Sequence, residues 1–142
     1  MIKILVSLPH KQDSCSFYRA YGVFADLNKK FNGQLQFIDL KQGAFTWADF
    51  NNIDLLFLQR PYAADLVPLV DYFRDMNKPI WVDYDDNLFE IPACNPAHHA
   101  FTDKAKSIMT YIMHAAQGAV DCGNWCWIQL GRSPLNQKRR PR

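Results

Sequence analysis

The sequence predicts a single α/β domain with a Rossmann-like, doubly wound parallel sheet. Short, almost continuously apolar runs alternate along the chain with segments whose apolar residues recur at helical spacing. Such runs are typical of parallel strands covered on both faces, and their alternation with helices indicates successive βαβ units. With 142 residues, 49% of them hydrophobic and 14% aromatic, the chain can build one hydrophobic core, which argues against a disordered protein.

The first half of the chain is predicted to contain three strands and one helix. IKILVSL, residues 2–8, is the first strand, and LQFIDL and IDLLFLQ are the second and third. Between the first two strands lies an amphipathic helix that Ser14 or Ser16 can cap and that Asn32-Gly33 can end. The apolar side of this helix consists of Phe17, Tyr21, Phe24, Leu27 and Phe31.

The second half continues the alternation. A helical stripe over residues 66–76 has Asp65 as its predicted cap and tolerates Pro68 in its first turn. PIWVDY, ending at residue 84, is the fourth strand. We expect a further helix to begin at Asn95-Pro96, and a fifth strand to begin at GAV, residues 118–120. In such sheets, ligands bind at the carboxyl ends of the strands, so the loops at 9–16, 59–62 and 83–95 are the candidate binding loops.

Three aspartates crowd the end of the fourth strand. Asp83, Asp85 and Asp86 follow a buried apolar run, and Asn87 comes next. Repulsion and desolvation both oppose such crowding, so it calls for an explanation. The aspartates could bind a divalent cation, or one could be a general base with a raised pKa. Alternatively, Asp86 or Asn87 folds back on the backbone as a turn while the other carboxylates are solvated.

Basic and aromatic residues in the other two loops are candidate ligand contacts. Arg60 stands at the end of the third strand, where it could hold a phosphate or carboxylate, or could neutralise the acidic loop beside it. His10 follows the first strand, at a place where doubly wound folds often bind phosphate. Tyr18 and Arg19 open the first helix and can reach the same cleft.

No cofactor or metal is predicted. The glycines of a dinucleotide-binding loop are absent after the first strand, as is the G-x-S-x-G elbow of a serine hydrolase. Cys122 and Cys126 with a histidine offer zinc ligands but lack the paired short spacings of zinc sites. The opening MIKILVSLPH lacks a signal-peptide pattern, and no run of 18 apolar residues occurs. We therefore expect a cytoplasmic protein without a membrane span and with reduced cysteines.

The basic charge is confined to the end of the chain. Residues 1–131 hold 11 basic and all 14 acidic residues, whereas residues 132–142 hold five basic residues and no acidic one. This end has no aromatic residues among its basic ones, so it is predicted to be a solvated basic tail rather than a nucleic-acid site. The predicted domain boundaries are accordingly 1–120 for the folded domain and 121–142 for an aberrant or disordered tail.

Three segments together resemble a known family. SFYRAYGVFADL after the first strand, DLLFLQRPY at the third and WVDYDDNLFEIPACNP at the fourth are similar to the amino-terminal half of GT-B glycosyltransferases, in the phage and bacterial group related to family 4. The resemblance covers residues 2–120. It implies a retaining transferase of two Rossmann-like domains, in which the first domain binds the acceptor, the second binds the nucleotide-sugar donor, and no metal is needed.

The resemblance also implies site residues. It places Tyr18-Arg19, Arg60 and Asp85-Asp86-Asn87 at the interdomain cleft. Together with the loop argument, this gives Asp85 and Asp86 as candidate catalytic residues, and His10, Tyr18, Arg19, Arg60 and Asn87 as candidate substrate-binding residues. A carboxylate kept there for function should not stabilise the fold, whereas a capping or ion-paired one should.

The chain departs from the family because it ends before a donor domain. We therefore expect the acceptor-side domain of a nucleotide-sugar-dependent glycosyltransferase, truncated and inactive without its donor domain. The alternatives are one subunit of a split transferase and a non-catalytic binding module. A metal-using transferase of the GT-A type is a weaker alternative, suggested by Asp83-x-Asp85 alone.

Overall fold

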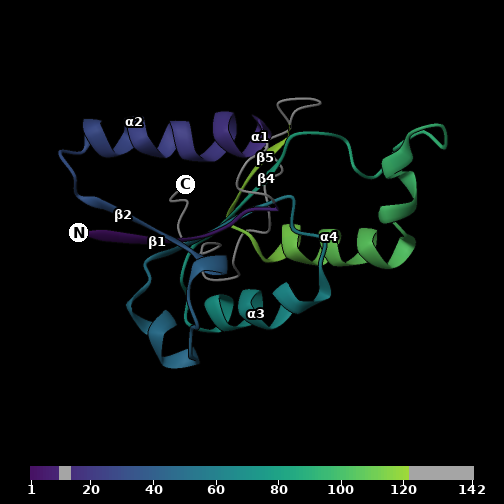
Figure 1. The fold of residues 1–142 in the computed structure, drawn as a ribbon. Helices are drawn as coiled ribbons and strands as arrows, with labels where there is room; N and C mark the ends of the chain where they lie inside the picture. The colour runs from purple at the N-terminus through teal and green to yellow at the C-terminus, as the bar shows by residue number, and fades with distance from the viewer. Residues whose placement is uncertain (10–13, 122–142) are drawn as a thin grey trace, which may run out of the picture.

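The computed structural model describes residues 1–9 and 14–121. These residues form an α/β domain around a five-stranded parallel sheet of order β2-β1-β3-β4-β5 (Figure 1). This confirms the predicted Rossmann-like fold class. The strands are β1 (Ile2–Ser7), β2 (Leu35–Asp39), β3 (Leu55–Gln59), β4 (Ile80–Tyr84) and β5 (Gly118–Asp121).

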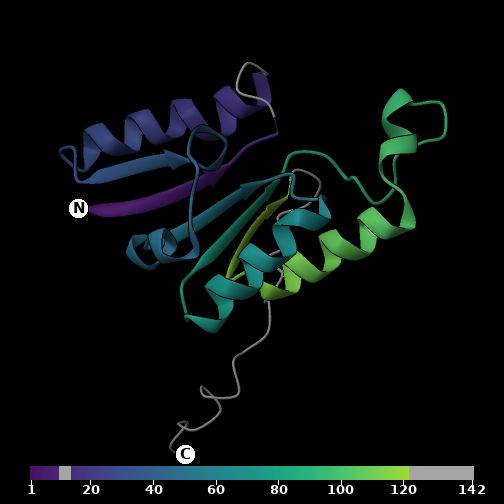
Figure 2. The same ribbon diagram turned by 60° about the horizontal axis from the view of Figure 1, so that its bottom comes forward.

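Helices cover both faces of the sheet, as expected for a doubly wound fold. Helix α2 (Gly22–Lys30) lies on one face, and α3 (Val67–Asp75) and α4 (Asp103–Ala115) lie side by side on the other (Figure 2). The chain runs outward from β1 to β2 and then returns to β3 on the other side of β1. The strand order therefore reverses between β1 and β3, and the carboxyl ends of these two strands define the switch point of the sheet.

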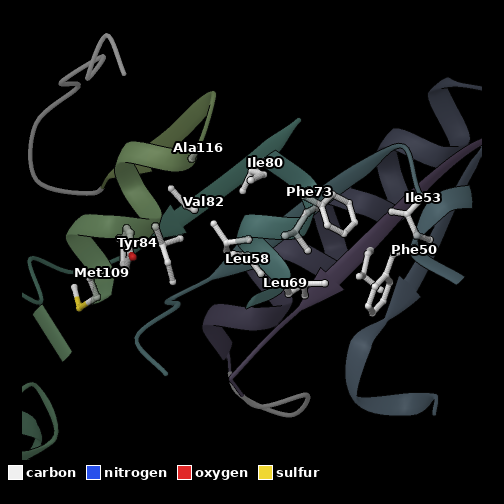
Figure 3. Packing of buried hydrophobic residues seen from close by; sticks show 14 of the residues in the cluster. Phe50, Ile53, Leu58, Leu69, Phe73, Ile80, Val82, Tyr84, Met109 and Ala116 are labelled. Atoms are coloured by element: carbon white, nitrogen blue, oxygen red, sulfur yellow. The ribbon is translucent and has the colours of Figure 1, made fainter. Parts of the chain in front are cut away.

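Alternate side chains of each strand point to opposite faces and enter two separate hydrophobic clusters. On β3, Leu56 and Leu58 belong to the larger cluster under α3 and α4, whereas Phe57 belongs to the smaller cluster under α2. Figure 3 shows the larger cluster, in which Phe73 of α3 packs among strand residues (Figure 3). Because the strands have apolar residues on both faces, they read as continuous apolar runs in the sequence.

The first predicted helix forms, but not as a uniform α-helix. A short α-helical turn, α1 (Ser14–Ser16), passes into a π-helical segment, Phe17–Tyr21, and then into α2. The predicted end is confirmed, because Asn32 and Gly33 adopt left-handed φ angles of 51° and 72°. Ser16 does not cap the helix with its side chain, which instead donates to Gln59 on β3.

One predicted helix cap and one predicted helix start are wrong. Asp65 does not cap α3, which begins after a 3₁₀ turn, Ala64–Leu66, and has no side-chain cap. Asn95 does cap a helical segment, but that segment is a 3₁₀ turn, Pro96–Ala100. Helix α4 starts separately, with Thr102 as its cap. The start signal at Asn95-Pro96 therefore belongs to the short 3₁₀ turn and not to α4.

The connection between β2 and β3 also forms helical turns, namely Leu40–Gln42 and Trp47–Asn52. Strand β5 begins at Gly118, as predicted, and runs one residue past the expected domain boundary. His10 and the predicted tail from residue 122 onward lie outside the described residues. Within the described part of the chain, no helix combines the length and the apolar character needed to cross a bilayer.

Candidate functional site

Polar side chains gather where the strands end. Strands β1, β3 and β4 are parallel neighbours, so their carboxyl ends share one edge of the domain. Of the site residues expected from the sequence, Arg60, Asp85, Asp86 and Asn87 follow β3 and β4 at this edge, and Tyr18 and Arg19 lie in the π-helical segment after β1. The sequence predicted this edge as the place for a ligand.

Arg19 forms a partly buried ion pair with Asp83. Its Nε lies 2.8 Å from Asp83 Oδ2 and 3.1 Å from Oδ1, and Nη2 donates a second bond to Oδ1. The Asp83 side chain is 4% exposed, so it requires such a partner. The π-helical segment places Arg19 toward β4 while Ser16, three residues earlier, reaches β3. This pair joins the first helix to the end of β4.

Arg60 forms a second ion pair, with Asp85. Its Nε and Nη2 each donate to one carboxylate oxygen of Asp85, whose side chain is only 7% exposed. Arg60 also has a left-handed φ of 48°, a conformation that costs a non-glycine residue energy and that clusters at functional sites. Its backbone N–H donates to the Asp83 carbonyl at 2.8 Å, which holds this turn against β4.

The charge state of Asp85 follows from these contacts. Burial by itself would raise the pKa of Asp85, but hydrogen bonds from Arg60 and from the Cys15 thiol outweigh it and keep the pKa below its usual value. In turn, the hydrogen bond to Asp85 raises the pKa of Arg60. Asp85 is therefore an ionised, doubly held carboxylate and a weak proton acceptor. Of the two roles left open for Arg60, the structure shows neutralisation of the acidic loop.

Asp86 and Asn87 differ from Asp85 in their surroundings. The Asp86 side chain is 69% exposed, and its Oδ2 lies 3.5 Å from Arg60 Nη2. Asn87 serves the turn, since its Oδ1 accepts from the Phe89 N–H at 3.3 Å and its Nδ2 donates to Glu90 at 3.1 Å. The turn interpretation therefore holds for Asn87. Asp86 is the aspartate of this loop whose carboxylate faces solvent.

Two crevices meet at Arg60. One, the loop crevice, has a volume of about 350 Å³ and lies between Arg60 and the segment 86–101. Its polar residues are Asp86, Asn87, Glu90 and Asn95, and Phe101, whose ring contacts Tyr62 at 5.2 Å, closes one side. This combination of carboxylates, amides and aromatic rings suits a hydroxyl-rich ligand.

The other, the switch-point crevice, has a volume of about 340 Å³ and lies between the ends of β1 and β3. Ser7 and Gln59 come from the strand ends, and Lys41 comes from the turn after β2. Gln59 is 3% exposed and accepts a hydrogen bond from the Ser16 hydroxyl at 3.0 Å through Oε1. Its Nε2 is buried and has no hydrogen-bond partner among the residues described.

Tyr18 and Arg19 do not line either crevice. They border an apolar hollow of about 430 Å³ between α2 and the sheet, together with Phe57 and Trp81. Tyr18 is 74% exposed and its ring contacts Phe17 edge-on at 5.3 Å. The structure thus brings Arg60, Asp86 and Asn87 into one crevice, and places Tyr18 and Arg19 beside another hollow.

No protein-family model matches this sequence, and no curated protein matches it either. Among solved structures, a conserved protein from Enterococcus faecalis V583 has a similar fold, with 13% sequence identity and a TM-score of 0.49 over 85% of this chain and 91% of that chain. A putative PLP-dependent beta-cystathionase from Corynebacterium diphtheriae matches 75% of this chain with 29% of its own, at 21% identity and a TM-score of 0.39. These likenesses carry no functional argument, so function must be inferred from the edge itself.

Sequence reasoning did not single out Gln59, Lys41 or Cys15 as functional candidates. Gln59 offered the clearest signal, because it is a polar residue at the end of an otherwise apolar strand. Cys15 lies in the predicted binding loop 9–16 and Lys41 follows β2, but the sequence does not show that the Cys15 thiol reaches Asp85 or that Lys41 reaches the crevice between β1 and β3. Among the residues described, no group of three or more His, Cys, Asp or Glu side chains is arranged to hold a metal ion.

Proposed function

We propose that this chain is the acceptor-side domain of a nucleotide-sugar-dependent glycosyltransferase of the GT-B type. The observation that carries the proposal is the convergence of two separate motifs, at Arg60 and at Asp85-Asp86-Asn87, on one crevice at the carboxyl edge of the sheet. These motifs are among those on which the sequence resemblance depends. Arg60 and Asp85 are 25 residues apart in the sequence but bond to each other in the structure, and this contact between two of the motifs supports the proposal.

The proposed roles follow from exposure and charge. Asp86, exposed beside Arg60, accepts hydrogen bonds from an acceptor hydroxyl and is the carboxylate placed to take its proton. Asn87 and Arg60 form the wall of the same crevice. Asp85 holds the Arg60 guanidinium in place rather than acting on the substrate, because both of its oxygens are already bonded.

Transfer itself requires a donor. A nucleotide sugar would bind to a second domain, supplied by further chain or by another subunit, and the reaction would occur where the two domains face each other. A non-catalytic binding module is the second candidate. It is favoured by the fact that Asp83 and Asp85 are both neutralised by arginines, which leaves a polar crevice better suited to binding than to proton transfer.

The experiment joins the chain to the donor domain of a GT-B transferase and measures sugar transfer to a panel of glycan acceptors. We expect transfer with at least one acceptor, and a loss of about 100-fold in kcat for Asp86→Asn if this carboxylate takes the proton. Asp26→Asn, a change of an exposed aspartate on α2, is the matched control and should leave kcat unchanged.

Two results would separate the candidates. An increase in KM with unchanged kcat for Asp86→Asn would assign this residue to acceptor binding alone. Acceptor binding without transfer by any fused enzyme would favour the binding module. Failure of the fused protein both to transfer sugar and to bind any glycan would contradict the proposed function.

A further inference from the structure

We infer that the switch-point crevice binds an anionic oxygen group, a phosphate or carboxylate, through Gln59 Nε2 and the Lys41 ammonium. This binding site is distinct from the loop crevice assigned to the acceptor. It does not depend on the proposed glycosyl transfer, because it follows from Gln59 at the end of β3 and Lys41 in the turn after β2.

The first observation is a buried donor without a partner. Buried amide groups in folded proteins nearly always have hydrogen-bond partners, since an unpaired one has lost its water and gained nothing. Gln59 Oε1 is satisfied by Ser16, but Nε2 is unsatisfied within the described structure. Gln59 also lines the crevice, so a ligand oxygen bound next to its amide would give Nε2 its missing acceptor.

The second observation is a positively charged side chain among the residues that line the same crevice. Lys41 lines the crevice, and its Nζ donates to the Pro9 carbonyl at 2.6 Å. This bond fixes the ammonium next to the end of β1 and uses one of its three donors. The remaining donors can reach a ligand in the crevice. Two donors of this kind, one of them charged, select a ligand group that only accepts hydrogen bonds.

The other charged residues of the crevice restrict where the anion can lie. Arg60 also lines it, but its charge is balanced by Asp85 and Asp86. Asp65, which is exposed, borders the crevice and repels an anion at its own end. The anion is therefore assigned to Gln59 and Lys41, and Asp65 is left to accept a hydrogen bond from a hydroxyl or amine elsewhere on the ligand.

The crevice lies where open parallel α/β sheets generally bind their ligands. In an open parallel sheet, the loops after the two strands at the switch point diverge, which leaves a crevice at the carboxyl edge where ligands bind. Here the switch point lies between β1 and β3, and the crevice is bounded by Ser7 and Gln59 at the ends of those strands.

The test measures binding of inorganic phosphate, acetate and glucose to the full chain by isothermal titration calorimetry. We expect saturable binding of phosphate or acetate and none of glucose. Gln59→Met and Lys41→Gln should each weaken anion binding about tenfold, which is the effect of removing one hydrogen bond to a charged group. Lys29→Gln, at an exposed lysine on α2, is the control and should bind like the unchanged chain.

A stability measurement distinguishes this role from a structural one. Met has a similar volume and removes an unsatisfied amide, so thermal unfolding of Gln59→Met without ligand should occur at an unchanged or higher temperature. If Gln59→Met does not fold, Lys41→Gln alone tests the site, because Lys41 is exposed. Anion binding that is equal in all variants would assign it to the basic residues 132–142 and overturn the inference. So would glucose binding without anion binding, or no binding up to about 50 mM.

Discussion

Arg60 determines the arrangement of the carboxyl edge. Its planar guanidinium holds both oxygens of Asp85, while its left-handed backbone turns the chain after β3. A lysine could not replace it, since an ammonium lacks the fixed pair of donors that matches a carboxylate. The residue thus combines a strained backbone with a bidentate ion pair, and both crevices of the edge include it.

We predict opposite behaviour for the two neighbouring aspartates. Asp85→Asn should lower the free energy of unfolding by about 1 to 3 kcal/mol, because it breaks a buried pair and leaves Arg60 without its full partner. Asp86→Asn should change it by less than about 0.5 kcal/mol, because that side chain is 69% exposed. Urea unfolding of the two variants measures both values.

The variants Asp85→Asn and Asp86→Asn also test the hypothesis drawn from the sequence, that a carboxylate kept for function should not stabilise the fold. Stability unchanged in both variants would return Asp85 to the candidate catalytic residues. Loss in both would remove Asp86 from them.

Lowering the pH should reduce the contribution of Asp85 to the free energy of unfolding. Its pKa is lower in the folded protein than in the unfolded chain, so its contribution is complete above the unfolded pKa of about 4 and is lost as the pH falls through the folded pKa. The difference in unfolding free energy between the unchanged chain and Asp85→Asn should therefore shrink below about pH 4. A difference that stays constant from pH 7 to pH 3 would show that charge is not its origin.

At the scale of elements, the helix after β1 contacts the carboxyl ends of both β3 and β4. Ser16 of α1 reaches Gln59 on β3, and Arg19 of the π-helical segment reaches Asp83 on β4. A π-helical turn shifts the side chains that follow it relative to a regular α-helix, and such turns are frequent at functional sites. The helix thereby contacts the ends of two adjacent strands.

A second element, the 3₁₀ turn before β3, is held by hydrogen bonds from one lysine. Lys78, just before β4, donates through Nζ to the carbonyls of Phe50, Asn51 and Ile53 at 3.0, 2.6 and 2.6 Å. These carbonyls stand at the end of the 3₁₀ turn Trp47–Asn52, where few backbone donors are available, although the Phe50 carbonyl also accepts from the Ile53 N–H at 3.2 Å.

Lys78→Met should therefore destabilise the domain by about 1 to 3 kcal/mol, measured by urea unfolding, because it removes a charged donor shared by three carbonyls. The same change at exposed Lys29 provides the comparison and should have little effect. Equal stability of the two variants would mean that water replaces the ammonium at no cost.

At the scale of the molecule, the two faces of the sheet are covered unequally. Among the residues that the structure describes, α3 and α4 together cover one face, whereas α2, with the short α1 and π-helical segment before it, lies on the other (Figure 2). On the α2 face, Trp81 of β4 remains 39% exposed and borders the apolar hollow. The larger cluster, between α3, α4 and the sheet, is therefore expected to contribute most of the stability, since burial of apolar surface is the main stabilising term.

A chain ending at Asp121 should keep its fold. The buried members of the two clusters, within the described residues, all lie between Leu5 and Ala116, and β5 ends at Asp121. We expect its free energy of unfolding to agree with that of the full chain within about 1 kcal/mol. A loss of more than about 2 kcal/mol would show instead that Trp125 or Trp127 contributes a large buried side chain.

The chain by itself should not transfer sugar from any nucleotide sugar. The proposed reaction requires a donor to be oriented against the acceptor, and in that proposal the loop crevice of this chain binds the acceptor while the donor binds to a second domain. Product formation by the purified chain, measured with a panel of radiolabelled nucleotide sugars, would contradict the division of roles between two domains. An inactive control is the same assay on the Asp86→Asn chain.

The site was only partly predictable from sequence. Arg60 and the aspartates stood out because charged residues directly follow apolar strands, and parallel strands carry such residues to one edge. The sequence left open which role Arg60 plays, since one arginine suits either a ligand or a carboxylate. The partner of Arg19 was not predictable, because 64 residues separate it from Asp83.

The amino-acid sequence by itself determined the class of this fold. Its apolar runs could be satisfied only by strands covered on both faces, and the spacing between them required helical crossovers. Only the tertiary structure decided which polar residues are satisfied and which are not. Asp85 became an ion-paired structural carboxylate, Asp86 stayed exposed, and Gln59 was buried with one donor unused. These differences arise from packing between distant segments, which local periodicity does not encode.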